Sequence, residues 1–150
     1  MYFRKKELIQ EDIKKIPKSF DVVGNIIIFT DFPKELNKKE KLVGEYLLKK
    51  FKNINTIAKK SKKYSGKLRT AKLKIIAGEK SLETIHKESG LKFKVNPEKV
   101  YFSPRSGTER LRIANLVKNN EEVLVMFSGM APFALIISKH SKAKEVYAIE

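Results

Sequence analysis

Val123-Leu-Val-Met-Phe-Ser-Gly-Met-Ala-Pro-Phe-Ala-Leu-Ile-Ile-Ser-Lys-His140 is the stretch that decides the fold of this chain. Its first five residues are all apolar, which is the pattern of a parallel strand covered on both faces. Ser128–Pro132 predicts a turn, and Pro132 suits the first position of a helix that runs to His140. Glu145–Ile149 predicts a second strand. Together these segments predict a βαβ unit.

The turn of this unit has the spacing of a dinucleotide-binding loop. Gly129, Ala131 and Ala134 stand where that loop has its three small residues, with alanine in place of the second glycine. Glu150 follows Gly129 by 21 residues, close to the spacing at which an acid at the end of the second strand holds ribose hydroxyls. Any βαβ unit needs a small-residue turn, so a ligand loop and a plain connection both stay open.

Tyr101–Arg112, Tyr-Phe-Ser-Pro-Arg-Ser-Gly-Thr-Glu-Arg-Leu-Arg, joins this unit to the chain before it. It holds a Ser-Pro turn, three arginines and one carboxylate. Ser106-Gly-Thr-Glu109 matches a capping box, in which Ser106 is the N-cap and Glu109 reaches back to its backbone. A carboxylate beside Arg105 and Arg110 also fits a functional role, because its proton affinity responds to those charges and to burial. Both explanations of Glu109 stay open.

Residues 1–100 predict a small α+β module in which strands predominate. Ser19–Thr30 predicts a hairpin with a tight turn at Gly24-Asn25, and Asn37–Phe51 predicts an amphipathic helix. Residues 1–16 suggest a short amphipathic helix or a docked arm. Further strands are predicted at Asn53–Ala58, Leu68–Ile76, Glu83–His86 and Leu91–Val95, with a turn over 87–90.

Positive charge is concentrated in this first module. The chain has 33 Lys and Arg against 17 Asp and Glu, a formal charge of +16. Residues 1–96 hold 25 basic and 11 acidic residues, a net of +14, whereas residues 97–150 hold 8 and 6, a net of +2. Such a block attracts a polyanion through counterion release. A merely Lys/Glu-rich composition would supply glutamate in matching numbers, so the charge predicts nucleic-acid binding without telling RNA from DNA.

The composition argues against several other classes of protein. With no cysteine there is no disulfide, thiolate metal site or cysteine nucleophile. Two histidines 54 residues apart give no zinc site; His86 is expected to be a core or edge residue and His140 to close a helix. No apolar run reaches the ~18 residues of a membrane span, and no signal-peptide pattern is present. We expect a soluble, cytoplasmic protein without a metal site.

Several of these motifs resemble those of the archaeal and eukaryotic-type tRNA (guanine-37-N1)-methyltransferases, a class I S-adenosylmethionine-dependent family. There a Tyr-Phe-Ser-Pro-Arg…Glu-Arg run precedes a Met-Phe-x-Gly-x-Gly-Pro-Phe loop. Here they read Tyr101-Phe-Ser-Pro-Arg105…Glu109-Arg110 and Met126-Phe-Ser-Gly-Met-Ala-Pro-Phe133. The family's middle domain is similar to four upstream motifs, Asp21-Val-Val-Gly24, Gly66-x-x-Arg69, Ala77-Gly78-Glu79 and Thr84-Ile-His-Lys87. The resemblance spans about Ser19 to Glu150.

The resemblance implies catalytic roles for two residues. Glu109 matches the general base that takes the N1 proton of the guanine next to the anticodon. Arg69 matches the arginine that steadies the guanine O6 as negative charge develops there, a role of the oxyanion type. The base must leave its stack and lie between the two modules.

The resemblance also implies binding roles for eight further residues. Those that match the surroundings of the flipped base are Tyr101, Pro104, Arg105 and Arg110. Those that match the S-adenosylmethionine loop are Phe127, Ser128 and Gly129, and Glu150 matches the ribose-binding acid. The expected partner is the anticodon stem-loop of tRNA, and the expected cofactor is S-adenosylmethionine.

The fold class we expect is an α+β RNA-binding module over residues 1–100, followed by the first βαβ unit of a Rossmann-like α/β domain over residues 101–150. The sequence departs from the family at Val125, where an acid is usual, and at Ala131, where glycine is usual. The family's small N-terminal domain and the later sheet strands have no counterpart in the 150 residues. We therefore expect an N-terminal fragment of such an enzyme, with a possible separately encoded C-terminal half and weak or no turnover alone.

Two alternatives remain open at this point. One is the related aminocarboxypropyltransferase of wybutosine synthesis, which uses the same cofactor and a similar fold. The other is a non-catalytic tRNA-binding module with a vestigial cofactor loop, which Val125 and Ala131 favour.

Overall fold

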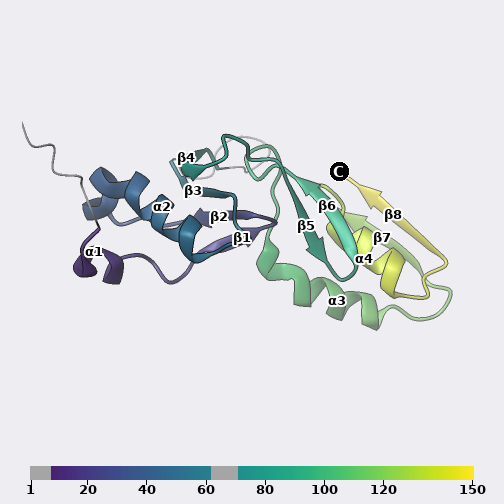
Figure 1. Cartoon of the computed structure of the whole chain (residues 1–150). Coiled ribbons are helices and arrows are strands. Elements are labelled where there is room, and N and C mark those ends of the chain that lie inside the picture. Colours follow the sequence, from purple (N-terminus) through teal and green to yellow (C-terminus); the bar gives the residue numbers. More distant parts are fainter. Residues whose placement is uncertain (1–7, 62–70) are drawn as a thin grey trace, which may run out of the picture.

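The computed structural model describes residues 8–61 and 71–150, and every structural statement below concerns this part of the chain. Figure 1 shows β1–β4 and α2 at one end of the molecule and β7, α4 and β8 at the other. The elements are, in order, α1 (Gln10–Lys14), β1 (Asp21–Val23), β2 (Ile26–Phe29), the 3-10 helix η1 (Lys34–Lys39), α2 (Glu40–Lys50), β3 (Thr56–Lys60), β4 (Leu73–Gly78), β5 (Thr84–Glu88), β6 (Leu91–Val95), the 3-10 helix η2 (Pro104–Ser106), α3 (Gly107–Leu116), β7 (Glu122–Met126), α4 (Pro132–His140) and β8 (Glu145–Ile149).

The first sheet has the strand order β1-β2-β3-β4. β1 and β2 are antiparallel and form the predicted hairpin at Gly24-Asn25, where Gly24 has φ +56°. A Cβ at Gly24 would lie 2.0 Å from Thr84 Oγ1, so this turn requires glycine both for its backbone angle and for its close approach to β5. β2 and β3 are parallel, and η1 and α2 connect them. β3 and β4 are antiparallel.

α2 covers one face of this sheet. A Cβ at Gly44 would lie 2.4 Å from the Cβ of Ala77, so the absence of a side chain lets the helix rest directly on β4. The apolar cluster between helix and sheet consists of Ile27, Phe29, Leu36, Val43, Leu47, Ile57 and Ile76. Burial of each large side chain of this kind stabilises the fold by roughly 1.5–3 kcal/mol.

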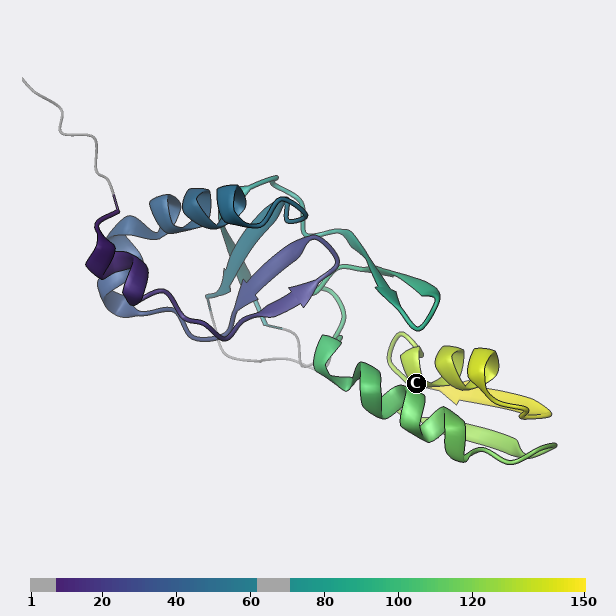
Figure 2. The ribbon, with the colours of Figure 1, turned by 60° about the horizontal axis from the view of Figure 1, so that its bottom comes forward.

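The other face of β1 and β2 belongs to a second apolar cluster, because successive strand residues point to opposite faces. The sheet contributes Val23, Ile26 and Ile28. The other buried members come from the hairpin β5–β6 and from the chain after it: Phe93, Val95, Phe102, Ala114, Ile136 and Ile137. The first sheet and the C-terminal elements therefore share a core, and Figure 2 shows the hairpin and α3 extending from the sheet toward α4.

β7 and β8 are parallel, with α4 as the connection between them. Val123 and Val125 pack on the second cluster, but Leu124 and Met126 on the opposite face are 54% and 61% exposed. The apolar pattern of this strand is typical of one covered on both faces, but in the described chain only one face is covered. A wholly apolar strand sequence shows no difference between its two faces. α3 and α4 pack on each other, and α4 packs on β8. The exposure of Leu124 and Met126 shows that the described residues leave the second face uncovered.

Several predicted boundaries differ from those observed. The helix predicted over Asn37–Phe51 begins as a 3-10 turn after Pro33 and becomes α-helical at Glu40. The strand predicted at Asn53–Ala58 begins later, at Thr56, where the amides of Asn55 and Thr56 share the Asn25 carbonyl as acceptor. The turn predicted over 87–90 is reduced to Ser89-Gly90, both with positive φ, which is the geometry of a tight hairpin turn. Residues 68–70 of the strand predicted over Leu68–Ile76 lie outside the described residues.

Gly44→Ala should destabilise the protein although alanine favours helix by roughly 1 kcal/mol over glycine. The added methyl collides with Ala77, and overpacking of this kind costs about 1–3 kcal/mol. Urea unfolding of the variant measures the loss, with Glu45→Ala at the neighbouring exposed position as control. Adding Ala77→Gly should restore stability, and a Gly44→Ala protein more stable than the parent would contradict the contact.

Candidate functional site

Tyr101–Arg112 folds as an extended entry, the 3-10 turn η2 and the helix α3. Pro104 begins η2, and Ser106 already has nearly helical angles, φ −87° and ψ 4°. An N-cap residue normally has extended angles that turn its side chain toward the first free amides. Within the described structure the Ser106 side chain makes no capping hydrogen bond. The predicted capping box is therefore wrong, because η2 runs directly into α3.

Glu109 pairs with Arg112 instead. Arg112 Nε donates to Glu109 Oε2 and Arg112 Nη2 donates to Glu109 Oε1, both at 2.7 Å. Both side chains are about half exposed, at 50% for Glu109 and 56% for Arg112. The hydrogen bonds from Arg112 lower the pKa of Glu109 below its ordinary 4.5. Glu109 is thus an ionised carboxylate at neutral pH, held by a cation one helical turn away.

Arg110 points into the protein. Its Nε and Nη2 donate to the two carboxylate oxygens of Glu88 at 2.7 and 2.6 Å, and Nη2 also donates to the Ser103 carbonyl at 3.0 Å. The guanidinium lies 5.1 Å from the ring centroid of Phe102 and 5.8 Å from that of Phe133. The side chain of Arg110 is 2% exposed, so it offers no open surface to a ligand in this structure. It supports from inside the segment Ser103–Arg110, which is called the site wall below.

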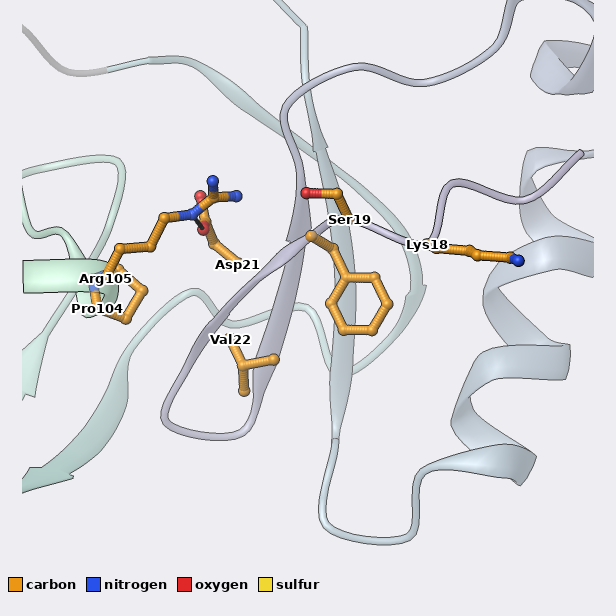
Figure 3. Close-up of a pocket in the computed structure, with 7 residues that line it drawn as sticks. Lys18, Ser19, Asp21, Val22, Pro104 and Arg105 are labelled. Carbon is orange, nitrogen blue, oxygen red and sulfur yellow. Dashed lines mark hydrogen bonds and ion pairs between the residues drawn. The ribbon is translucent and has the colours of Figure 1, made fainter.

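A hollow of about 520 Å³ lies between β1 and η2 (Figure 3). It is lined by Lys18, Ser19, Phe20, Asp21, Val22, Pro104 and Arg105. Arg105 Nε lies 2.6 Å from Asp21 Oδ1 across it. Tyr101, 60% exposed, and Pro104 line an adjoining cavity of about 50 Å³ that Asp21 also borders. The fold thus gathers three of the four residues predicted around the base, and Arg110 lies behind them.

Sequence reasoning did not assign Asp21 or Glu88 to the site. Asp21 stands in one of the motifs that carried the resemblance, but its ion pair with Arg105 joins residues 84 positions apart. The sequence predicts Glu88 within a turn, whereas in the structure it is the last residue of β5 and the partner of Arg110. Arg69, the second predicted catalytic residue, lies outside the described residues.

The predicted cofactor loop brings its residues together. The Gly129 N–H donates to Glu150 Oε2 at 2.7 Å, and the Ser128 N–H donates to the Ile149 carbonyl at 3.0 Å. Phe127 is 87% exposed with φ +53°. A Cβ on Gly129, which has φ +57°, would meet no described atom within 4 Å. Space beside Gly129 is therefore open to an approaching group.

Ala131 has φ +61° at the position where the family has glycine, a left-handed conformation that costs an alanine about 1–2 kcal/mol. Pro132 follows as the first residue of α4, so the loop ends on free backbone amides. Such a helix start favours a negative or polar ligand group. The backbone amides at the start of α4 and the Glu150 carboxylate fit a nucleoside with a ribose diol.

Two other kinds of site can be judged for residues 8–61 and 71–150. His, Asp and Glu side chains form no group there that could hold a metal ion. None of the helices in those ranges combines the length and the apolar character needed to cross a membrane.

Two protein families match this chain. The family described as the TRM5/TYW2 methyltransferase domain matches residues 84–150, and the one described as the TYW2 N-terminal domain matches residues 3–81. The tRNA (guanine(37)-N(1))-methyltransferase Trm5b of Pyrococcus abyssi is 40% identical over 141 residues, which cover 94% of this chain and 42% of that protein. The crystal structure of wild-type Trm5b from this species has a TM-score of 0.81 at 38% identity, covering 97% of this chain and 43% of that one.

Two further solved structures are similar. The complex of aTrm5 with tRNALeu has a TM-score of 0.79 at 38% identity, covering 94% of this chain and 41% of that one. Methanocaldococcus jannaschii Trm5 in complex with adenosine has a TM-score of 0.75 at 35% identity, covering 98% and 45%. The chain therefore spans less than half the length of these relatives.

Arg110→Met should lower the free energy of unfolding by about 3–5 kcal/mol, because it leaves the Glu88 carboxylate buried without its cation. Arg112→Met on the same helix is the control and should change stability little, since its ion pair is exposed. Combining Arg110→Met with Glu88→Leu should recover much of the loss, because an apolar pair replaces the ion pair. Equal urea midpoints for the two single variants would show that the buried pair does not support the wall.

Proposed function

The chain belongs to the TRM5/TYW2 methyltransferase family, and we propose that it takes part in S-adenosylmethionine-dependent methylation of N1 of guanine 37 in tRNA. The observation that carries the proposal is the contact of the Gly129 N–H with the Glu150 carboxylate, which unites the two predicted cofactor-side positions at one edge of the β7–β8 sheet. The 40% identity to a relative named for this reaction supports the same conclusion.

The proposed organisation is an α+β RNA-binding module over residues 1–100 and the start of a Rossmann-like methyltransferase domain over residues 101–150. The basic charge of residues 1–96 supports the first assignment. The parallel pair β7–β8 with its connecting helix α4 supports the second. The hairpin β5–β6 packs in the same core as α3 and α4 and so serves as the joint between the two.

On the cofactor side, Phe127, Ser128, Gly129 and Glu150 are proposed to hold S-adenosylmethionine, which supplies the methyl group when bound. Glu150 would exchange the Gly129 amide for ribose hydroxyls, since a carboxylate accepts several hydrogen bonds. The exposed Phe127 ring offers an apolar surface to an adenine base. The solved complex of a relative with adenosine supports a nucleoside as a ligand of this family.

On the RNA side, the hollow beside β1 is proposed to receive guanine 37 and its neighbours from the anticodon stem-loop. Tyr101, Pro104 and Arg105 would border the unstacked base, with Arg110 holding their segment from behind. Glu109, already ionised, would accept the N1 proton once Arg112 no longer occupies both its oxygens. Arg69, which lies outside the described residues, is proposed to steady the guanine O6.

Two finer expectations stay predictions. One is a cytoplasmic location. The other is a separately encoded C-terminal half that completes the enzyme; the exposed side chains on which such a half would pack are Leu124, Met126, Tyr147 and Ile149.

A second candidate function is aminocarboxypropyl transfer to the same tRNA region, and the match of residues 3–81 to the TYW2 N-terminal domain favours it. The mass added to the tRNA nucleoside distinguishes this reaction from methylation.

A non-catalytic tRNA-binding module is the third candidate, and the strained Ala131 in the cofactor loop favours it.

Glu109→Gln should reduce methyl transfer about hundredfold or more, because general-base catalysis typically contributes 10²–10⁴-fold. The full gene product that carries this sequence is incubated with unmodified tRNA bearing G37 and labelled S-adenosylmethionine, and the nucleosides are identified by mass. Glu122→Gln, which removes an exposed carboxylate on β7, is the control. Normal transfer by the Glu109→Gln protein would rule out its role as base, and absence of any transfer by the parent would rule out the proposed reaction.

Glu150→Gln should weaken S-adenosylmethionine binding about ten- to hundredfold, the effect of losing a charge-assisted hydrogen bond worth about 1.5–3 kcal/mol. Isothermal titration calorimetry measures it, with Glu145→Gln at the start of β8, the strand that precedes Glu150, as control. If the parent protein gives no heat while it still binds tRNA with a steep dependence on salt, the loop is vestigial and the non-catalytic candidate holds.

A further inference from the structure

His86 on β5 connects the β1–β2 turn to the site wall. The Gly24 N–H donates to His86 Nδ1 at 3.1 Å, and His86 Nε2 lies 3.7 Å from Glu88 Oε2. Glu88 accepts two hydrogen bonds from Arg110, which donates a third to the Ser103 carbonyl. These contacts, through His86, Glu88 and Arg110, connect the first sheet to the residue before Pro104.

The hydrogen bond from Gly24 requires a neutral His86. A ring nitrogen that accepts an N–H carries no proton, so the His86 proton is on Nε2, toward Glu88. The ring is 15% exposed and lies 5.0 Å edge-on from Phe102. Burial and the Arg110 charge lower the pKa of His86 below 6.5, although Glu88 opposes them. The stability that neutral His86 contributes is complete above pH 6.5 and is lost as the pH falls toward the lowered pKa.

β1 is tied to the wall at both ends. Its first residue, Asp21, pairs with Arg105 across the hollow. Gly24, directly after its last residue, bonds to His86. Because β1 forms one side of the hollow and η2 the other, these two links set the distance between the sides. The exposed Asp21 link is open to exchange with solvent, whereas the His86 link is buried.

Building on the function proposed above, we propose that His86 is a positioning residue for the reaction at the hollow. In its neutral form it holds the β1–β2 hairpin against the Ser103–Arg110 segment, so that Arg105 and Glu109 keep their places relative to β1. When His86 gains a proton on Nδ1, two donors face each other at Gly24 and the link opens. The ionisable groups that face His86 in the described structure are Glu88 from its own strand and Arg110 from α3.

Two substitutions at position 86 separate the link from simple packing. His86→Phe keeps the ring volume and the contact with Phe102 but removes the acceptor. His86→Asn keeps an acceptor near the Nδ1 position and cannot take up a proton. Thr84→Val is the matched control, because Thr84 bonds to Asn25 in the same turn without any path to Arg110. We expect His86→Phe to lower the kcat for methyl transfer about ten- to hundredfold, with the KM for S-adenosylmethionine unchanged, and His86→Asn and Thr84→Val to keep most of the parent kcat.

The pH profile distinguishes a titrating link from a static one. The parent kcat should fall below pH 6.5 and the His86→Asn kcat should not, while Glu109 titrates below 4.5 in both. Coincident profiles, or a Thr84→Val protein as slow as His86→Phe, would overturn the proposal.

A readout independent of activity separates this proposal from the proposed function. With two histidines in the chain, the NMR signals of His86 and His140 are assigned with His86→Asn and His140→Gln. The His86 signal should titrate below pH 6.5, and the Gly24 amide should exchange slowly in the parent and in His86→Asn but rapidly in His86→Phe. Unchanged Gly24 exchange in His86→Phe would overturn the link. If no variant or parent transfers a methyl group, the proposed function fails, and the NMR result alone decides whether the link exists.

Discussion

The structure of the candidate site depends on one buried ion pair, between Arg110 of α3 and Glu88 of β5. Two charges inside a protein are tolerable when their remaining hydrogen-bonding capacity is used. Arg110 meets this condition with both oxygens of Glu88, the Ser103 carbonyl and two aromatic rings. Because Ser103 directly precedes η2, the pair fixes where the exposed residues of η2 and α3 emerge. The buried arginine thus supplies the rigid support that lets neighbouring polar side chains remain accessible.

Local chemistry made much of the fold predictable. The hairpin turn at Gly24-Asn25 and the helix start at Pro132 depend on backbone preferences of single residues, and the structure has both. Boundaries set by neighbours were not predictable in this way. β3 begins at Thr56, where the amides of Asn55 and Thr56 both bond to the Asn25 carbonyl, which is about thirty residues away in sequence. The pattern of β7 alone does not show which of its faces is uncovered, because an all-apolar strand has no alternation of polar and apolar residues.

The features of the candidate site also differ in how far the sequence predicts them. The spacing of Gly129 and Glu150 predicts a loop and an acid at the ends of two strands of a βαβ unit, and the structure places the two residues in contact. The partners of the charged residues were not predictable from spacing. Ser106 and Glu109 have the sequence spacing of a capping box. The 3-10 turn before α3 gives Ser106 nearly helical angles, which removes the geometry on which such a cap depends. Arg105, Arg110 and Arg112 look alike in sequence, and only their packing separates a hollow-lining, a buried and an exposed arginine.

In the role proposed for the hollow, the ion pair between Asp21 and Arg105 would make it selective. An anion that binds Arg105 takes that cation from Asp21 and leaves the carboxylate to find another donor. A simple anion offers no donor, so the interaction that it gains with Arg105 is offset by the interaction that Asp21 loses. A ligand that carries an acceptor and an N–H or O–H side by side satisfies both residues at once. The edge of a nucleobase has that pattern, so the Asp21 carboxylate beside Arg105 would favour the proposed base over the phosphates that surround any nucleic acid.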